Sequence, residues 1–420
     1  MNDQSSNDPE REPSADGATA TLSRSDRATS DDWLDKLLTL CRERDASDIH
    51  LSAGLPPYLR VQGVLEPQTE LGATSNEWLA KVVESLPLGA SRQSLERIGS
   101  ADGALSAKDG TRFRVNVFRR RDALSIALRR LEDRFRTLAE LGLPDSLYEL
   151  CDLAHGLVVV GGPTGSGKST SLATLIDRIN QTRRGHIITI EDPIEYLHES
   201  RLSLVNQRQV GSDAATFDDA LVASLRQDPD VILVGEIREI KTIRTAITAA
   251  ETGHLVFTTV HAGDCVGVIE RLVSVFPAEE QPGVRRQLSL VLQAVVVQHL
   301  LVADGRLVGQ ASSLPSSTKA SLDEGQANGR LEAYPTARRT RVVASEVMRM
   351  TPAVANLIAN GKGNQIYSSM ESGSAAGMQT FEQDLARLWV GGWISEQTAT
   401  AYARNVSVLQ DRASRLRLRK

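Results

Sequence analysis

The sequence is poor in cysteine and contains no long apolar run. Its three cysteines, Cys41, Cys151 and Cys265, lie far apart and form no CxxC pair. That spacing supports neither a disulfide framework nor a ribbon-type zinc site, and it fits a reducing compartment. Because no stretch approaches the roughly 18 apolar residues that span a bilayer, the sequence predicts no direct membrane span.

Two further absences concern the beginning of the chain and its charge. The opening segment, MNDQSSNDPEREPSADG, has neither the basic nor the apolar region of a signal peptide, so we expect a cytoplasmic protein. The chain carries 48 Lys and Arg against 53 Asp and Glu, a formal charge of -5. This balance lacks the basic footprint of nucleic-acid binders, so nucleic acid is not an expected partner.

The chain is long enough for two domains and tails, because its 420 residues exceed the roughly 250 to 300 that one core reaches. Residues 1–31 are rich in Ser, Asp, Ala and Thr and predict a disordered tail. Residues 32–131 begin with a one-sided helical pattern and continue with alternating strand patterns, which predict a small α+β domain. A linker with Gly142 and Pro144 is expected at 132–148.

The larger domain is predicted at 149–368. Short apolar strands alternate there with helical stretches, which indicates a parallel α/β sheet: GLVVVGG, HIITI, VILVG and HLVFTTV. A polar stretch without periodicity predicts a mobile insertion at about 311–338. Residues 369–420 have a helical pattern that ends in the basic segment RASRLRLRK.

A phosphate-binding loop follows the first of these strands. The segment GPTGSGKS fits G-x-x-x-x-G-K-[ST] and lies between a strand and a helix, which disfavours a chance match at a glycine turn. Its glycines let backbone N–H groups wrap phosphates at a helix N-terminus. We expect Lys168 to reach the β and γ phosphates of ATP, and the Ser169 hydroxyl to ligate Mg²⁺. The candidate nucleotide-binding residues are Gly162, Pro163, Thr164, Gly165, Ser166, Gly167, Lys168, Ser169 and Thr170, the last as a supporting contact.

Acidic residues end two other predicted strands. Glu236 follows VILVG, where the carboxylate of a Walker B element would face magnesium, although a lone Glu after a strand is usually a solvated cap. Glu195 closes the segment EDPIE after HIITI, and carboxyl ends of parallel strands meet at one edge of the sheet. Glu195 is therefore a candidate general base, the alternative being an acidic cluster at a helix start.

Histidines flank a further strand, and arginines crowd two strands of the smaller domain. His254 and His261 enclose LVFTTV, but isolated histidines are more often structural, and no third ligand has a spacing suited to a metal. The arginines could form a solvated face, bind an anion, or neutralise phosphoryl charge in a ring ATPase. They are Arg112, Arg114, Arg119, Arg120, Arg121, Arg129 and Arg130.

Long segments carry a resemblance to a known family. They are ASDIHLSAGLPPYLRVQGVL, FRVNVF, ITIEDPIEY, NQRQVGSDAATFDDALVASLRQDPDVILVGEIRE and AAETGHLVFTTVHAGDCVGVIERLVSVFPAEEQ. From about Asp32 to Asn405 the chain resembles the type IV pilus retraction ATPases of the PilT and PilU group. The resemblance implies an α/β fold with a PAS-like N-terminal domain, a RecA-like P-loop core and C-terminal helices, assembled as a homo-hexamer with ATP at domain and subunit boundaries.

The resemblance also implies roles and partners. Glu195 is similar to the catalytic glutamate, Glu236 to the Walker B carboxylate, and Thr164 to a nucleotide contact in the loop. His254 and His261 match the His-box residues, and Arg114 and Arg129 match arginines that meet the γ phosphate. The implied activity is ATP hydrolysis that drives pilus retraction and twitching motility. The implied partners are an inner-membrane pilus platform protein and a second retraction ATPase, with the chain cytoplasmic and peripherally associated with the inner membrane.

Departures from the family pattern leave the direction of work open. The retraction-associated motif AIRNLI reads AVANLI at 353–358, with Ala355 in place of the arginine, while Gln209 and Val222 replace an expected Glu and Arg. The chain lacks the CxxC pair of extension and type II secretion ATPases, which favours a retraction type. The alternatives are a related assembly, secretion or conjugation ATPase, a nucleic-acid motor, and a non-hydrolysing accessory subunit, against which the intact Lys168, Glu195 and Glu236 argue.

Overall fold

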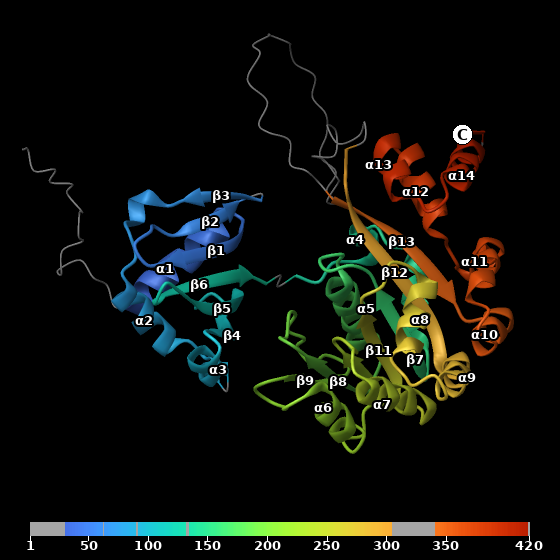
Figure 1. Ribbon diagram of the computed structural model, residues 1–420, viewed down its shortest axis with the longest axis horizontal. Coiled ribbons are helices and arrows are strands. Elements are labelled where there is room, and N and C mark those ends of the chain that lie inside the picture. The colour runs from blue at the N-terminus through green and yellow to red at the C-terminus, as the bar shows by residue number, and fades with distance from the viewer. Residues whose placement is uncertain (1–29, 62, 90, 132–133, 305–340, 419–420) are drawn as a thin grey trace, which may run out of the picture. The chain divides into compact units, whose positions relative to one another are not determined.

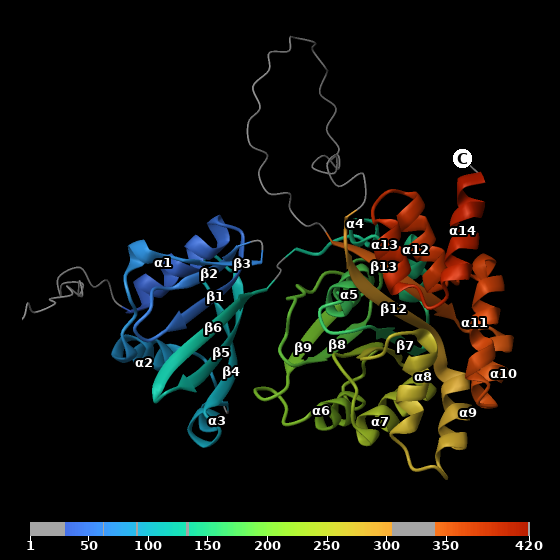
Figure 2. The ribbon, with the colours of Figure 1, turned by 45° about the horizontal axis from the view of Figure 1, so that its top comes forward.

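The computed structural model describes residues 30–61, 63–89, 91–131, 134–304 and 341–418 (Figures 1 and 2). The chain divides into two compact units, Met1–Arg130 and Leu131–Lys420. The α/β fold class with a smaller N-terminal domain is confirmed. The predicted insertion at 311–338 lies outside the described residues. The predicted tail at 1–31 does so too, except for residues 30 and 31, which begin the first helix of the chain.

The N-terminal unit is an antiparallel sheet covered by helices, with strand order β3-β2-β1-β6-β5-β4. Its helical pattern is confirmed, because Leu34, Leu37 and Leu38 of the first helix are buried against the sheet. The elements are α1 (Ser30–Glu43), β1 (Ala46–Ser52), β2 (Tyr58–Val61), β3 (Val64–Pro67), the 3-10 helix η1 (Thr69–Leu71), α2 (Asn76–Ser85), α3 (Ser91–Arg97), β4 (Ser100–Ser106), β5 (Arg112–Arg120) and β6 (Ala123–Arg130).

The C-terminal unit contains a seven-stranded sheet in the order β13-β12-β7-β11-β10-β8-β9. All neighbouring pairs are parallel except β12 and β13. The elements are α4 (Leu138–Leu141), η2 (Asp145–Asp152), β7 (Gly156–Gly161), α5 (Lys168–Thr182), β8 (His186–Glu191), β9 (Leu204–Gln209), α6 (Phe217–Ser224), β10 (Val231–Val234), α7 (Ile240–Glu251), β11 (Leu255–Val260), α8 (Cys265–Ser274), α9 (Gln281–Val291), β12 (Leu292–Val302), β13 (Arg341–Arg349), α10 (Pro352–Ala359), α11 (Gly363–Ser372), η4 (Ser374–Ala376), α12 (Phe381–Val390), α13 (Glu396–Tyr402) and α14 (Val406–Leu418).

The central strands of this sheet are buried on both faces, as their apolar runs predict. Every residue of β7, β10 and β11 is buried. Leu157 and Val159 of β7 face a core shared with α6 to α11, whereas Val158 and Val160 face a core shared with α4, η2 and α5. Side chains alternate between the faces of a strand, so an uninterrupted run of valines requires helices on both sides.

The segment predicted as a linker at 132–148 contains α4 and the beginning of η2. Leu138 and Leu147 are buried in the core beside α5, and a capping box between Thr137 and Glu140 begins α4. Gly142, which the sequence predicts in a linker, adopts a left-handed conformation with φ 74° and ends α4. This segment therefore packs as part of the C-terminal unit.

The C-terminal helices cover the end of the sheet that carries β12 and β13. Leu301 and Ala344 of these strands pack with α12 to α14. Within 369–420 the described residues form the end of α11, η4, α12, α13 and α14, joined by turns. No helix among the described residues is long and apolar enough to cross a membrane.

Candidate active site

The phosphate-binding loop joins β7 to α5 and depends on glycine. Gly165 and Gly167 have φ values of 75° and 92°, and Gly167 is the N-cap of α5. At Gly162, a Cβ would lie 2.4 Å from the backbone oxygen of Gln298. A side chain at this position would push the loop away from β12, so the glycine fixes the shape of the loop as well as permitting it.

Lys168 is the first residue of α5 and is buried, with an exposed fraction of 8%. Its ammonium donates hydrogen bonds to the backbone oxygens of Gly162, at 3.1 Å, and Pro163, at 3.0 Å. Burial lowers the pKa of Lys168, and the negative charges of Glu236 and Glu195 oppose that shift. The two carboxylates predicted for ATP chemistry are therefore close enough to act electrostatically on the loop lysine.

Glu236 lies just beyond the carboxyl end of β10, and Arg238 and His261 are its neighbours. Arg238 donates from Nε and Nη2 to its two oxygens at 2.5 and 2.6 Å, and Nε2 of His261 lies 3.3 Å from Oε1. Burial would raise the pKa of Glu236, but the hydrogen bond from Arg238 and the charges of His261, Arg238 and Lys168 outweigh it and lower that pKa. Glu236 is thus held as a carboxylate at the edge of the sheet.

A pocket of about 270 Å³ opens beside this group. Glu236, His261 and Thr164 of the phosphate loop share it with two arginines that we did not predict, Arg238 and Arg271. The remaining lining residues are Ile237 and Val260. Arg238 follows β10 by a few residues, so its position in GEIRE could have identified it. The pocket combines cations with a carboxylate, as binding of a phosphate and a metal requires.

Glu191 is the last residue of β8, Glu195 follows in the turn after it, and the two carboxyl groups differ in their surroundings. Glu191 accepts hydrogen bonds from the Thr189 hydroxyl at 2.7 Å and from the Glu195 backbone N–H at 3.4 Å, and burial raises its pKa. Its role is to hold the turn that carries Glu195. Next to Glu195, Tyr196 donates to the hydroxyl of Thr170 at 3.1 Å. Thr170 thus supports the site through a contact with this turn.

The structure separates the two predicted histidines. His261 follows the carboxyl end of β11, next to Glu236, whereas His254 precedes the amino end of that strand. Nδ1 of His254 lies 2.9 Å from the backbone oxygen of Ala249, and its own backbone oxygen accepts from Gly156 at the start of β7. The strand between the two histidines runs the height of the sheet, so within this unit His254 is not beside the phosphate loop.

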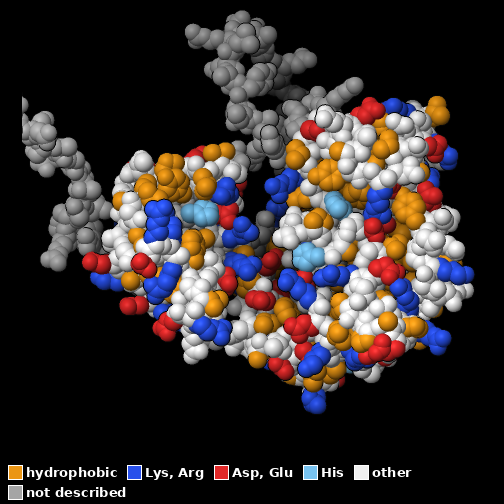
Figure 3. All heavy atoms as spheres, viewed as in Figure 1, with side chains coloured by type: hydrophobic (Ala, Val, Ile, Leu, Met, Phe, Trp, Pro, Cys, Tyr) orange, Lys and Arg blue, Asp and Glu red, His pale blue; other side chains and the backbone are white. Residues whose placement is uncertain are grey.

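Arg114 and Arg129 lie opposite each other on β5 and β6 of the N-terminal unit. Arg114 is exposed, and Arg129 pairs with Asp48 at 2.9 Å while its side chain stays 72% exposed. Asp48 also lies 3.6 Å from Arg60. Burial would raise the pKa of Asp48, but the hydrogen bonds from Arg129 and Ser47 outweigh it and lower that pKa. Figure 3 shows several groups of basic side chains on the viewed face of this unit.

Gln298 is a further residue at the site that the sequence analysis missed. It lies on β12, is 1% exposed, and donates from Nε2 to the backbone oxygen of Ser166 at 2.9 Å. The buried Ser166 hydroxyl has no hydrogen-bond partner within the described part of the chain. A single glutamine inside the apolar run AVVVQHLLV is the signal that could have pointed to Gln298.

Known proteins share this sequence and architecture. A sequence model of the type II/IV secretion system protein family matches residues 24–388. The chain is 39% identical over 369 residues to the type IV pilus retractation ATPase PilT of Pseudomonas aeruginosa, covering 88% of this chain and 97% of that protein. It is 37% identical to the type IV pilus ATPase PilU of the same bacterium, covering 90% of each. A crystal structure of the pilus retraction motor PilT with bound ADP aligns with a TM-score of 0.77 at 39% identity, over 90% of this chain and 99% of that one. The chain therefore belongs to the type II/IV secretion system protein family and is a PilT-family retraction ATPase.

Proposed function

We propose that this chain assembles as a homo-hexamer, hydrolyses ATP and uses the energy to retract a type IV pilus. The observation that carries the proposal is the group at the carboxyl edge of the sheet. There Glu236 and His261 line one pocket with Thr164 of the phosphate loop, and the charges of Glu236 and Glu195 oppose the lowering of the pKa of Lys168 by burial. The relatives named for pilus retraction match nearly the full length of their own chains. A non-hydrolysing accessory subunit would not need both carboxylates at this lysine.

The chain's own groups would divide the work of phosphoryl transfer. Backbone N–H groups of the loop wrap the phosphates at the N-terminus of α5, and Lys168 exchanges its bonds to loop carbonyls for phosphate oxygens. Glu195 orients the attacking water and accepts its proton as the new bond to phosphorus forms and the bond to the leaving oxygen breaks. His261 keeps its position beside Glu236.

Ser169 and Glu236 fit a magnesium ion that arrives with ATP. Magnesium takes hard oxygen ligands, and it commonly uses one or two protein oxygens with phosphate and water completing the shell. The Ser169 hydroxyl is exposed on the first turn of α5, and the lowered pKa of Glu236 keeps its carboxylate charged. When bound, Mg²⁺ neutralises charge that develops on the phosphate. The described residues contain no group of three or more His, Cys, Asp or Glu that could hold a metal without a phosphate.

Arg114 and Arg129 would complete the site from the N-terminal unit. An arginine that contacts a developing phosphoryl charge is worth roughly 10³ to 10⁵ in rate, whereas a solvated surface arginine contributes almost nothing. Nucleotide binding would then set the geometry between domains and subunits, and hydrolysis would release it. The further partners that we propose are an inner-membrane pilus platform protein and a second retraction ATPase, with the hexamer on the cytoplasmic side.

The arginine assignment is tested by alanine substitution in the assembled ring. Arg114→Ala and Arg129→Ala should each lower the ATPase rate by roughly 10³-fold. The matched control is Arg120→Ala, which removes another exposed arginine of β5. If all three variants keep the wild-type rate, the arginines form a solvated face.

The function itself is tested by deletion in the source organism. Cells without the chain should carry pili but fail to shorten them, and a plasmid copy should restore shortening. Bare cells would indicate an assembly motor instead. Normal pilus dynamics combined with a secretion or conjugation defect would indicate another branch of the family.

A further inference from the structure

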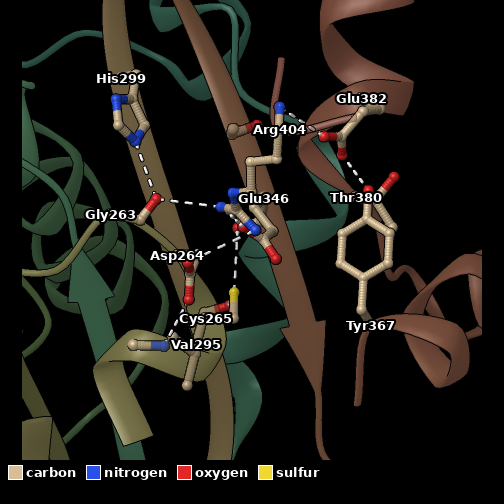
Figure 4. Close-up of polar contacts among 12 residues, drawn as sticks. Gly263, Asp264, Cys265, Val295, His299, Glu346, Tyr367, Thr380, Glu382 and Arg404 are labelled. Carbon is tan, nitrogen blue, oxygen red and sulfur yellow. Dashed lines mark hydrogen bonds and ion pairs between the residues drawn. The ribbon is translucent and has the colours of Figure 1, made fainter. Parts of the chain in front are cut away.

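A network of polar side chains joins the turn after His261 to the C-terminal helices (Figure 4). At its centre is Arg404, which lies between α13 and α14. Its Nη2 donates to Oε2 of Glu346 on β13 at 2.6 Å and to the backbone oxygen of Gly263 at 3.2 Å. Its Nη1 lies 3.7 Å from Oδ2 of Asp264. One guanidinium thus contacts a strand and the turn that follows β11.

The Gly263–Asp264 turn is fixed on its other sides too. Oδ1 of Asp264 accepts from the backbone N–H of Gly267 at 2.5 Å and thereby caps α8. Nε2 of His299 on β12 lies 3.1 Å from the same Gly263 oxygen that Arg404 contacts. Because His261 precedes this turn by two residues, a shift of the turn would move its imidazole relative to Glu236.

Arg404 is itself positioned by α12. Oε1 of Glu382, a fully buried residue of that helix, accepts the backbone N–H of Arg404 at 3.1 Å, and its Oε2 contacts the hydroxyl of Tyr367. The guanidinium lies over the ring of Phe381, 5.8 Å from the centroid. The location of the Arg404 side chain therefore depends on how the C-terminal helices pack.

Charge makes this contact hard to replace. Glu346 is fully buried, and within the described residues its Oε1 has no hydrogen-bond partner. Burial raises the pKa of Glu346 to about 6, and Arg404 opposes that shift. The Arg404 side chain is 34% exposed, so water reaches part of it, while Nη2 contacts Glu346 and Gly263 and Nη1 lies near Asp264. The guanidinium of Arg404 is thus shared between the buried carboxylate of Glu346 and the Gly263–Asp264 turn.

We propose that Arg404 is a positioning residue, which holds His261 against Glu236 by fixing the Gly263–Asp264 turn and so couples the packing of the C-terminal helices to turnover. The inference rests on the proposed ATP hydrolysis. This role differs from a purely structural one. The contact of Arg404 with the turn should affect the rate of ATP hydrolysis, whereas its contact with Glu346 should affect the stability of the fold.

The experiment compares full-length variants in two assays, steady-state ATPase kinetics and amide hydrogen exchange of residues 259–268 without nucleotide. Arg404→Met removes the guanidinium, and Arg404→Lys keeps a charge for Glu346 but not the planar fork that reaches the turn. Arg404→Met with Glu346→Gln avoids leaving a buried carboxylate unpaired. The control is Arg412→Met, which breaks a contact with Glu371, 3.2 Å away in the same region, at a side chain that is 27% exposed.

Arg404→Met and the double variant should lower kcat by about ten-fold and leave the KM for ATP within about two-fold, because a misplaced group costs rate more than binding. The turn should exchange faster in both. Arg404→Lys should be thermally more stable than Arg404→Met, while its kcat stays low. Arg412→Met should match the wild type in kcat and in the exchange of the turn. A wild-type kcat or unchanged exchange in Arg404→Met overturns the inference, as does an equal loss in Arg412→Met. If the wild type itself hydrolyses no ATP, the proposed function fails, and the exchange assay still decides whether Arg404 holds the turn.

Discussion

The two ends of the seven-stranded sheet carry similar side chains and use them differently. At the amino ends, Oδ2 of Asp230 accepts the backbone N–H of His186 at 2.8 Å, and Nδ1 of His186 lies 2.9 Å from the Gln227 oxygen. His254, at the same end, likewise faces a backbone oxygen. The polar side chains at this end therefore form hydrogen bonds with backbone groups of the chain itself.

At the carboxyl ends the side chains are directed at one another instead. His261 and Arg238 contact Glu236, and its charge reaches Lys168. In a parallel sheet the crossover helices begin at this edge, so their N-terminal N–H groups and loops meet there and leave room for a ligand. The type of a polar residue therefore says little about its function until it is known whether the residue lies at the amino or the carboxyl end of a strand.

The largest effect that the comparison predicts is at Lys168. Lys168→Ala should lower Mg-dependent ATPase activity by roughly 10³-fold or more, because the developing charge on the phosphate loses its buried cation. Phosphate release from the purified protein measures it, and Lys241→Ala, an exposed lysine of α7, is the control. Near wild-type turnover in Lys168→Ala would contradict the assignment of ATP hydrolysis to the carboxyl ends of the strands.

Glu195→Gln should lose hydrolysis by roughly 10² to 10⁴-fold while ATP still binds, since the amide keeps the shape but cannot accept a proton. Titration with a fluorescent ATP analogue measures binding, and phosphate release measures turnover. A loss of binding in parallel with turnover would make Glu195 a structural residue of the turn after β8.

The two histidines compare the two ends directly. His261→Gln should lower kcat by about ten-fold, because Glu236 loses the imidazole that lies 3.3 Å from its carboxylate. His254→Gln should leave kcat unchanged and lower the free energy of unfolding by about 1 kcal/mol, through its backbone contact. Kinetics and chemical denaturation of both variants measure this, and equal kcat losses would contradict the separation of the ends.

The smallest effect concerns Glu346, the buried carboxylate that Arg404 joins to the Gly263–Asp264 turn. The pKa of Glu346 is raised from 4.5 to about 6, so the protonated form is favoured on folding. Stability from this group is fully present below pH 4.5 and is lost as the pH rises through about 6. Between pH 5 and 7.5, the free energy of unfolding of the wild type should fall by about 1 kcal/mol relative to Glu346→Gln. Denaturant titrations at both pH values measure the difference, and parallel pH profiles would contradict it.

The sequence predicted the parts of the molecule that rest on local patterns. Uninterrupted valine runs predict strands with helices on both faces, and GPTGSGKS predicts the loop, because only glycine suits its backbone. Gln298 and Arg404 could not be predicted in the same way. Each acts on a backbone oxygen more than a hundred residues away, and only the strand order of the sheet and the packing of the C-terminal helices bring them there. The sequence identifies the two histidines of HLVFTTVH as parts of one motif, but the strand between them places them at opposite ends of the sheet.

Chemistry at the carboxyl ends of the strands is proposed to power the shortening of pili. The direct measurement is the length of fluorescently labelled pili over time, in cells of the source organism that carry Glu195→Gln or His254→Gln on the chromosome. We predict that Glu195→Gln cells extend pili that do not shorten, while His254→Gln cells shorten theirs normally. Shortening in both strains at the wild-type rate would contradict the account.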